Sequence, residues 1–124
     1  MILVVDDDEE VRTAIARALG ELGYPVREAA DGPAALAALG EERPELVILD
    51  YRMPDMDGAE VARAIAGIDA DLPVIFSTGH AALRALRNAA GEDVSVLEKP
   101  FTLDELDALL SSHLAEGRRR RQAA

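Results

Sequence analysis

The stretch LVILDYRMPDMDG, residues 46–58, contains the features that decide the fold. It begins with four consecutive apolar residues, a run typical of a strand that is buried on both faces of a sheet. Asp50 follows this run directly, and a polar loop then leads to Gly58. From Gly58 to Ile68 the spacing of the apolar residues predicts a helix. The stretch is therefore one strand–loop–helix unit of an α/β protein.

The same unit recurs four more times along the chain. Further apolar runs of strand length lie at Ile2–Val5, Val26–Ala30, Val74–Phe76 and Val94–Leu97. An apolar face from Val11 to Leu22 predicts the first helix, which Gly23 ends. Further helices are predicted from Asp31 to about Gly40 and over Ala81–Ala90. The last helix begins at Thr102, where Glu105 completes a capping box. Five alternating strands and helices predict a parallel sheet with helices on both faces.

Composition and charge restrict the class of protein. The 124 residues suit one domain, which we expect over residues 1–115, with a basic, disordered tail over 116–124. The net charge of −11 repels nucleic acid and membrane surfaces and attracts cations. The absence of cysteine excludes disulfides and thiolate ligands. We find neither a signal peptide nor an apolar run of about 20 residues, and we expect a cytoplasmic protein without direct nucleic-acid or membrane contact.

Polar residues follow the predicted strands where those strands end. Asp6 and Asp7 follow the first strand, Asp50 follows the third, and Thr78 and Lys99 come two residues after the fourth and fifth. The carboxyl ends of parallel strands meet at one edge of the sheet, where ligands bind in a crevice. We therefore expect three carboxylates, a hydroxyl and an ammonium group at one site.

These residue types together indicate phosphoryl transfer. Three neighbouring carboxylates repel one another unless a cation neutralises them, and oxygen ligands of this kind suit Mg²⁺. A carboxylate can act as a nucleophile toward a phosphoryl group. The chain has twelve arginines and one lysine; a compact ammonium group at Lys99 differs from a planar guanidinium in how it binds phosphate oxygens. The residues predict Mg²⁺-assisted transfer of a phosphoryl group to a carboxylate.

Four motifs then make the sequence resemble the response-regulator receiver domains of two-component systems, the CheY-like superfamily. They are VVDD at 4–7, ILDYRMPDMDG at 48–58, FSTGH at 76–80 and EKPF at 98–101. The resemblance covers residues 2 to about 115. It implies a flavodoxin-like (βα)5 three-layer sandwich with the strand order 2-1-3-4-5.

The resemblance also implies a metal site for Mg²⁺, with Mn²⁺ as an alternative. Asp50 is similar to the phosphoacceptor of the family and is also a metal ligand. Asp7 would be a direct ligand, Asp6 would act mainly through a metal-bound water, and the backbone carbonyl of Arg52 would complete the protein ligands.

Other residues would contact the phosphoryl group. By resemblance, Thr78 would bond a phosphoryl oxygen, Lys99 would pair with Asp50 before phosphorylation and with the phosphoryl group afterwards, and Gly79 would leave room for the incoming group. The bond between Lys99 and Pro100 is expected to be cis.

The sequence departs from the family pattern at the switch residue. Many receivers carry Tyr or Phe three residues before the lysine, and this chain has Val96. The stretch PVIFSTGH at 73–80 is similar to the PFxFATGY signature of receivers that lack this aromatic residue. Arg52 and His80 occupy the variable positions that flank the phosphoryl group, where they would tune the dephosphorylation rate.

The expected function is to accept a phosphoryl group from a sensor histidine kinase or a phosphotransfer protein onto Asp50 and to switch partner binding in a phosphorelay. The chain would not be an enzyme beyond its own phosphorylation and dephosphorylation. The output would be a downstream protein or a second copy, bound through the fourth helix, fifth strand and fifth helix. Ala14 and Ala18 are equally consistent with a kinase-docking patch and with filler of the first helix.

Two alternatives have different consequences. A pseudo-receiver that serves as a protein-interaction scaffold without phosphorylation would have lost Asp50, Lys99 or an N-terminal acid, and the sequence keeps all of them. A Mg²⁺-dependent phosphatase would need a second carboxylate two residues after its nucleophile, and Arg52 stands there. The sequence does not identify the cognate kinase, the oligomeric state, or whether the chain is a separate protein or one part of a larger regulator.

Overall fold

The computed structural model describes residues 1–54 and 56–123, and its side chains are described up to Leu114 with the exception of Asp55. Strands and helices alternate along the chain, with a 3-10 turn (η1) before the fourth helix. In order they are β1 (Ile2–Val5), α1 (Glu9–Glu21), β2 (Val26–Ala29), α2 (Gly32–Glu41), β3 (Leu46–Asp50), α3 (Gly58–Ile68), β4 (Val74–Gly79), η1 (His80–Ala82), α4 (Leu83–Ala90), β5 (Ser95–Lys99) and α5 (Leu103–Ala123).

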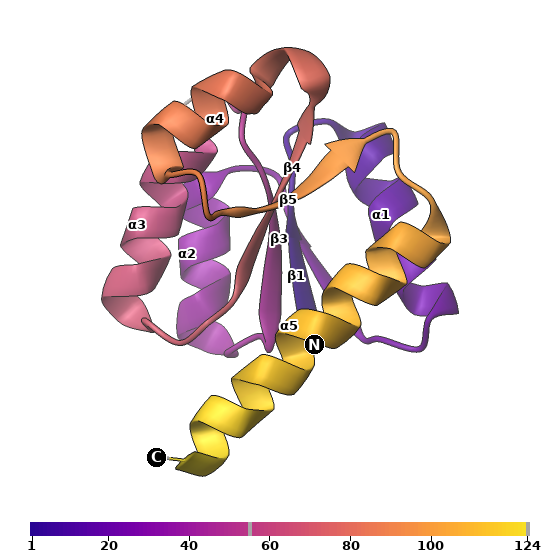
Figure 1. Ribbon diagram of the computed structural model, residues 1–124, viewed down its shortest axis with the longest axis vertical. Coiled ribbons are helices and arrows are strands. Elements are labelled where there is room, and N and C mark those ends of the chain that lie inside the picture. The colour runs from indigo at the N-terminus through magenta and orange to yellow at the C-terminus, as the bar shows by residue number, and fades with distance from the viewer. Residues whose placement is uncertain (55, 124) are drawn as a thin grey trace.

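The five strands form one parallel sheet in the order β2-β1-β3-β4-β5. Figure 1 shows α2, α3 and α4 on one side of this sheet and α1 and α5 on the other. The fold class and strand order are therefore those predicted, a flavodoxin-like three-layer sandwich. In such a sheet the strand order reverses beside β1, so a crevice opens at the carboxyl ends of β1 and β3.

The sheet separates two apolar cores. Leu3, Val5 and Leu49 face the core beneath α2, α3 and α4, whereas Ile2 and Ile48 face the core beneath α1 and α5. The residues of β1 and the first four of β3 are almost fully buried. Burial on both faces explains why these strands are continuous apolar runs rather than alternating ones.

Side chains fix the start of most helices. Asp8, Asp31 and Asp57 each accept a hydrogen bond from a backbone N–H in the first turn of α1, α2 and α3. At α5, the Thr102 hydroxyl accepts from the Glu105 N–H at 3.1 Å and the Glu105 carboxylate accepts from the Thr102 N–H at 3.4 Å, so the predicted capping box is confirmed. These caps satisfy N–H groups that lack a partner within the helix.

The last two strands are longer than predicted. β4 extends to Gly79 and β5 to Lys99. Thr78 pairs with Glu98 and Gly79 with Lys99 in register, so backbone pairing continues where the side chains become polar. α5 continues to Ala123 through most of the stretch expected to be disordered; the domain boundary at residue 115 stays a prediction, and Ala124 lies outside the described residues.

Within the described part of the chain, none of the helices combines the length and apolar composition that crossing a membrane requires.

Candidate functional site

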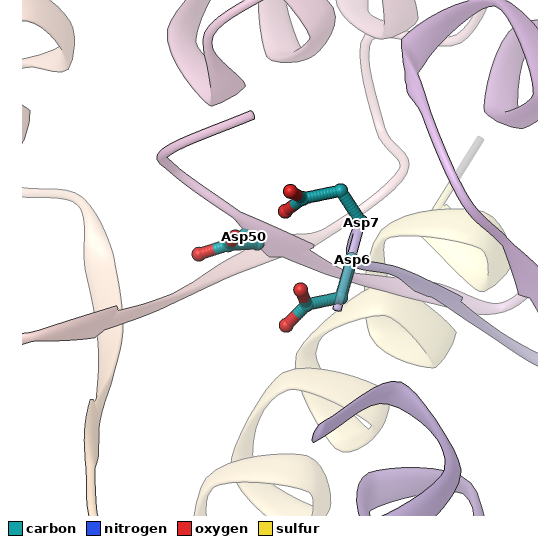
Figure 2. Close-up of side chains that lie close together, drawn as sticks. All are labelled: Asp6, Asp7 and Asp50. Atoms are coloured by element: carbon teal, nitrogen blue, oxygen red, sulfur yellow. The ribbon is translucent and has the colours of Figure 1, made fainter. Parts of the chain in front are cut away.

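Three carboxylates meet at the carboxyl edge of the sheet. Asp6 and Asp7 follow β1 directly, and Asp50 is the last residue of β3. Each offers an oxygen, and these oxygens lie within 4.8 Å of one another. Figure 2 shows the three side chains directed into one shared space from two adjacent strand ends. Asp6 and Asp50 are 1% and 8% exposed, whereas Asp7 is exposed, so the cluster is open to solvent on one side.

Lys99 brings the positive charge of β5 to this cluster. Its Nζ lies 3.3 Å from Asp6 Oδ2 and 3.6 Å from Asp50 Oδ1. The shorter distance permits a weak hydrogen bond to Asp6, and the longer one is an ion pair without a good hydrogen bond. The bond between Lys99 and Pro100 is cis, as predicted. One ammonium group therefore faces both buried acids.

The other predicted residues line the same cavity. It measures about 380 Å³, and Arg52, Thr78 and Gly79 lie in its wall together with the three acids and Lys99. Thr78 is 2% exposed. A Cβ built onto Gly79 would have no neighbour within 4 Å, so this glycine borders open space. The structure thus brings together the predicted metal ligands with Thr78, Gly79 and Lys99, while their chemical roles stay predictions.

The environment of Asp50 disfavours its ionised form. The pKa of Asp50 is raised from 3.8 to about 6, first by burial and then by the negative charges of Asp6 and Asp7, against the lowering effects of Lys99 and of the Arg52 backbone N–H. The single ammonium group does not balance three acids. A divalent cation would supply the missing charge, and carboxylate oxygens are ligands that such hard cations prefer.

A close backbone approach holds the loop that follows Asp50. The Gly58 N–H donates to the Tyr51 carbonyl at 2.7 Å. A Cβ on Gly58 would lie 2.8 Å from both the Asp50 carbonyl oxygen and Tyr51 Cα, which is closer than van der Waals contact allows. The sequence analysis placed Gly58 only at a helix start; the DG pair after a loop was the available signal, but the backbone contact depends on the fold.

The structure adds two contacts that the sequence analysis missed. Arg12 Nη1 donates to the Asp6 carbonyl at 2.9 Å, and the Tyr51 hydroxyl donates to the Ala85 carbonyl in α4 at 3.3 Å. No pattern distinguished Arg12 from the other arginines, and Tyr51 was one letter of a longer motif. Both contacts join the site to helices that pack on opposite faces of the sheet.

His80 lies beside the site without reaching its acids. Its Nδ1 lies 2.8 Å from Glu98 Oε1, and its side chain is 91% exposed. His80 is the first residue of the 3-10 turn η1 that precedes α4, and the predicted effect on the dephosphorylation rate stays a prediction. Val96 is half-buried against the core beneath α4.

Comparisons with known proteins agree with this geometry. A profile described as the response regulator receiver domain matches residues 2–111. The response regulators MprA of Mycobacterium tuberculosis (strain ATCC 25177 / H37Ra) and of Mycolicibacterium vanbaalenii are each 42% identical over 115 residues, which are 91% of this chain. Those residues are 50% and 49% of the two relatives, so the chain spans about half the length of these curated proteins.

Solved structures give the same result. The receiver domain of NtrX from Brucella abortus is 32% identical, with a TM-score of 0.85 over 93% of this chain and 98% of that one. The chemotaxis protein CheY4 of Vibrio cholerae is 28% identical, with a TM-score of 0.77 over 90% of this chain and 95% of that one. With the sheet order, the acid cluster and the matching profile in agreement, this chain belongs to the response regulator receiver domain family of two-component signalling.

Proposed function

We propose that Asp50 accepts a phosphoryl group from the phosphohistidine of a sensor histidine kinase or phosphotransfer protein, with Mg²⁺ bound beside it. The observation that carries the proposal is the meeting of Asp6, Asp7 and Asp50 oxygens within 4.8 Å, with the Lys99 ammonium group 3.6 Å from Asp50. This arrangement would supply a nucleophile, a cation site and a cationic side chain in one cavity.

The donor set fits a hard divalent cation. Asp6, Asp7 and Asp50 offer carboxylate oxygens, and Arg52, whose backbone carbonyl is the predicted third direct protein ligand after Asp7 and Asp50, lies in the same cavity wall. Mg²⁺ is held in proteins by few carboxylates and several waters, which suits a site that is open on one side; Mn²⁺ has similar ligand preferences. When bound, the cation would neutralise the acids and polarise the phosphoryl oxygens.

In the proposed step a carboxylate oxygen of Asp50 attacks phosphorus. A P–O bond to Asp50 forms while the P–N bond to the donor imidazole breaks, and the bonding electron pair leaves with the imidazole nitrogen. Attack requires the ionised carboxylate, and a pKa of about 6 leaves most of Asp50 ionised at neutral pH even without the cation. Lys99 and the Thr78 hydroxyl would then bind the oxygens of the new acyl phosphate.

An apolar groove supports a docking site for the donor protein. A hollow of about 590 Å³ lies between α1 and the segment after β5, and its lining includes Ala14, Ala18, Lys99, Phe101 and Leu103. Leu103 is 41% exposed. Small side chains on α1 would allow a helix of the donor to approach the cavity closely. This favours a docking role for Ala14 and Ala18 over a purely helix-forming one.

The output surface follows from the elements that carry Thr78 and Lys99. Thr78 lies in β4 just before η1 and α4, and Lys99 ends β5 just before α5. Movement of either residue toward phosphoryl oxygens would displace these elements, so a downstream protein or a second copy would bind the face of α4, β5 and α5. With Val96 in place of an aromatic switch, the loop between β4 and α4 would carry the change.

Mass spectrometry tests the proposal directly. Incubation of the chain with a small phosphodonor and Mg²⁺ should add one phosphoryl group, and neither EDTA-treated protein nor Asp50→Asn should acquire it. Asp57→Asn is the matched control, because Asp57 caps α3 outside the acid cluster. Absence of an adduct on the wild-type chain, or an adduct that persists in Asp50→Asn, would reject the proposal in favour of a non-phosphorylated scaffold.

A further inference from the structure

We propose that Arg12 positions the metal-binding acids by holding the peptide group between Asp6 and Asp7 in one orientation. The inference rests on the proposed function, because it assigns Arg12 to the same cation site. Arg12 lies in the first turn of α1, four residues after the N-cap Asp8. Its Nη1 donates to the Asp6 carbonyl at 2.9 Å, and its Nε donates to the Glu28 carboxylate at 3.0 Å.

The first contact acts on both acids because the peptide group is planar. The Asp6 carbonyl and the Asp7 N–H belong to one rigid unit, so a bond that fixes the carbonyl also fixes the direction in which the chain enters Asp7. The Asp7 side chain is exposed, so core packing does not hold it. Its backbone therefore sets where its carboxylate lies, and Arg12 holds that backbone.

Asp6 is also anchored through its side chain and its own N–H. Its carboxylate accepts from the Asp8 N–H at 2.9 Å and from Lys99 at 3.3 Å. Its own N–H donates to the Ala29 carbonyl in β2 at 3.2 Å. These bonds hold the side chain and the entering strand, and the Arg12 bond holds the carbonyl through which the chain continues to the second acid.

The pairing with Glu28 explains why an arginine suits this position. A guanidinium group presents donors on different edges of one rigid plane, so it can reach a carbonyl and a carboxylate together. Glu28 lies in β2, and its charge offsets that of Arg12, which therefore does not replace a cation at the acids. The Arg12 side chain is 16% exposed, so little water competes for its donors.

Calorimetric titration of the full chain with Mg²⁺ tests the metal-site consequence. We expect Arg12→Ala to raise the Kd for Mg²⁺ about tenfold or more, the scale on which groups that orient metal ligands act. Arg12→Lys should recover part of the affinity, because one ammonium group reaches one acceptor well. Arg27→Ala is the matched control, since it removes another arginine ion pair of β2, with Glu41, and should keep the wild-type Kd. Wild-type affinity in a folded Arg12→Ala would overturn the proposal.

A metal-free readout separates this proposal from the proposed function. The Asp8 N–H, bonded to the Asp6 carboxylate, should exchange with solvent faster in Arg12→Ala than in Arg27→Ala, measured by NMR in EDTA. Equal exchange rates of the Asp8 N–H in the two variants would contradict the positioning role of Arg12, whether or not the wild type binds Mg²⁺. Faster exchange only in Arg12→Ala, with no Mg²⁺ binding by the wild type, would support positioning and reject the cation site. If Arg12→Ala fails to fold, Glu28→Gln and Arg12→Lys provide the same comparison.

Discussion

In each central strand, the apolar interior of the sheet and its polar carboxyl edge are only one residue apart in sequence. Val5 and Leu49 are almost fully buried among apolar side chains, and the next residues, Asp6 and Asp50, are buried acids facing one another. The interior gains stability from apolar burial, whereas the edge loses stability by holding like charges together. Substitutions in the two regions should therefore have opposite effects on stability.

The largest expected loss of stability comes from the interior. Ile48 is 1% exposed at the centre of β3, and Ile48→Ala should lower the free energy of unfolding by about 2–5 kcal/mol through lost burial and a cavity. Ile68→Ala, at a side chain that is 46% exposed, should stay within about 0.5 kcal/mol of the wild type. Urea unfolding measures both, and similar losses at the two sites would contradict the burial argument.

The edge should show the opposite sign at neutral pH. Because the folded chain raises the pKa of Asp50 to about 6, it binds that proton more tightly than the unfolded chain does. The resulting stability is present below pH 3.8 and is lost as the pH rises through about 6, by up to about 3 kcal/mol. Asp50→Asn should therefore unfold at higher urea than the wild type at neutral pH in EDTA, and this advantage should shrink in acid.

Two measurements sharpen that result. Asp31→Asn removes one charge from an exposed helix cap while keeping the cap, so it controls for net charge. Mg²⁺ should lower the pKa of Asp50 in a carbon-detected NMR titration, because a bound cation favours the ionised carboxylate. A pKa that stays near 6 at saturating Mg²⁺ would count against cation binding at Asp50.

Gly58, the first residue of α3, ends the loop that follows Asp50 and has no room for an added methyl group. In Gly58→Ala the new Cβ would meet backbone atoms at 2.8 Å, which should cost about 1–3 kcal/mol and slow phosphorylation by displacing Asp50. Gly67→Ala, in the same helix with nothing within 4 Å of the new Cβ, should instead stabilise the fold by about 0.5–1 kcal/mol. A stable and fully active Gly58→Ala would remove the packing explanation.

The smallest effect concerns the contact from the edge to α4. Tyr51→Phe removes the hydroxyl that donates to the Ala85 carbonyl at 3.3 Å, and should cost about 0.5–1.5 kcal/mol or less. Amide hydrogen exchange in α4 should become faster, whereas Tyr24→Phe, on the opposite face, should leave α4 unchanged. Identical exchange in both variants would mean that this hydroxyl does not stabilise α4.

The sequence predicted the parts of the fold that apolar patterns encode. α3 begins and ends at the predicted residues, Gly58 and Ile68, because an aspartate cap and an apolar face define it locally. The predicted β5 ended at Leu97, but the strand continues to Lys99, since its polar last residues pair through their backbone with β4. Pairing of this kind depends on the neighbouring strand and leaves no side-chain pattern.

The residues of the candidate site also divide into those that the sequence predicted and those that it did not. Asp50 and Lys99 could be placed at one site because strand ends share an edge in a parallel sheet. Arg12 and the Gly58 contact could not be found, because a hydrogen bond to a carbonyl and a close backbone approach depend on distances that only the folded chain fixes. The motifs predict which atoms would react, and three-dimensional packing shows which contacts hold them.

The cluster of Asp6, Asp7, Asp50 and Lys99 also has a simple charge balance. Three carboxylates and one ammonium group sum to −2, which one divalent cation would cancel. A phosphoryl group on Asp50 would add about one further negative charge to this neutral set. The modified site would then attract any nearby hydrogen-bond donor, and Thr78 in the cavity wall carries one. The excess negative charge after phosphoryl transfer would thus draw Thr78 toward the phosphoryl group and displace the η1 turn between β4 and α4.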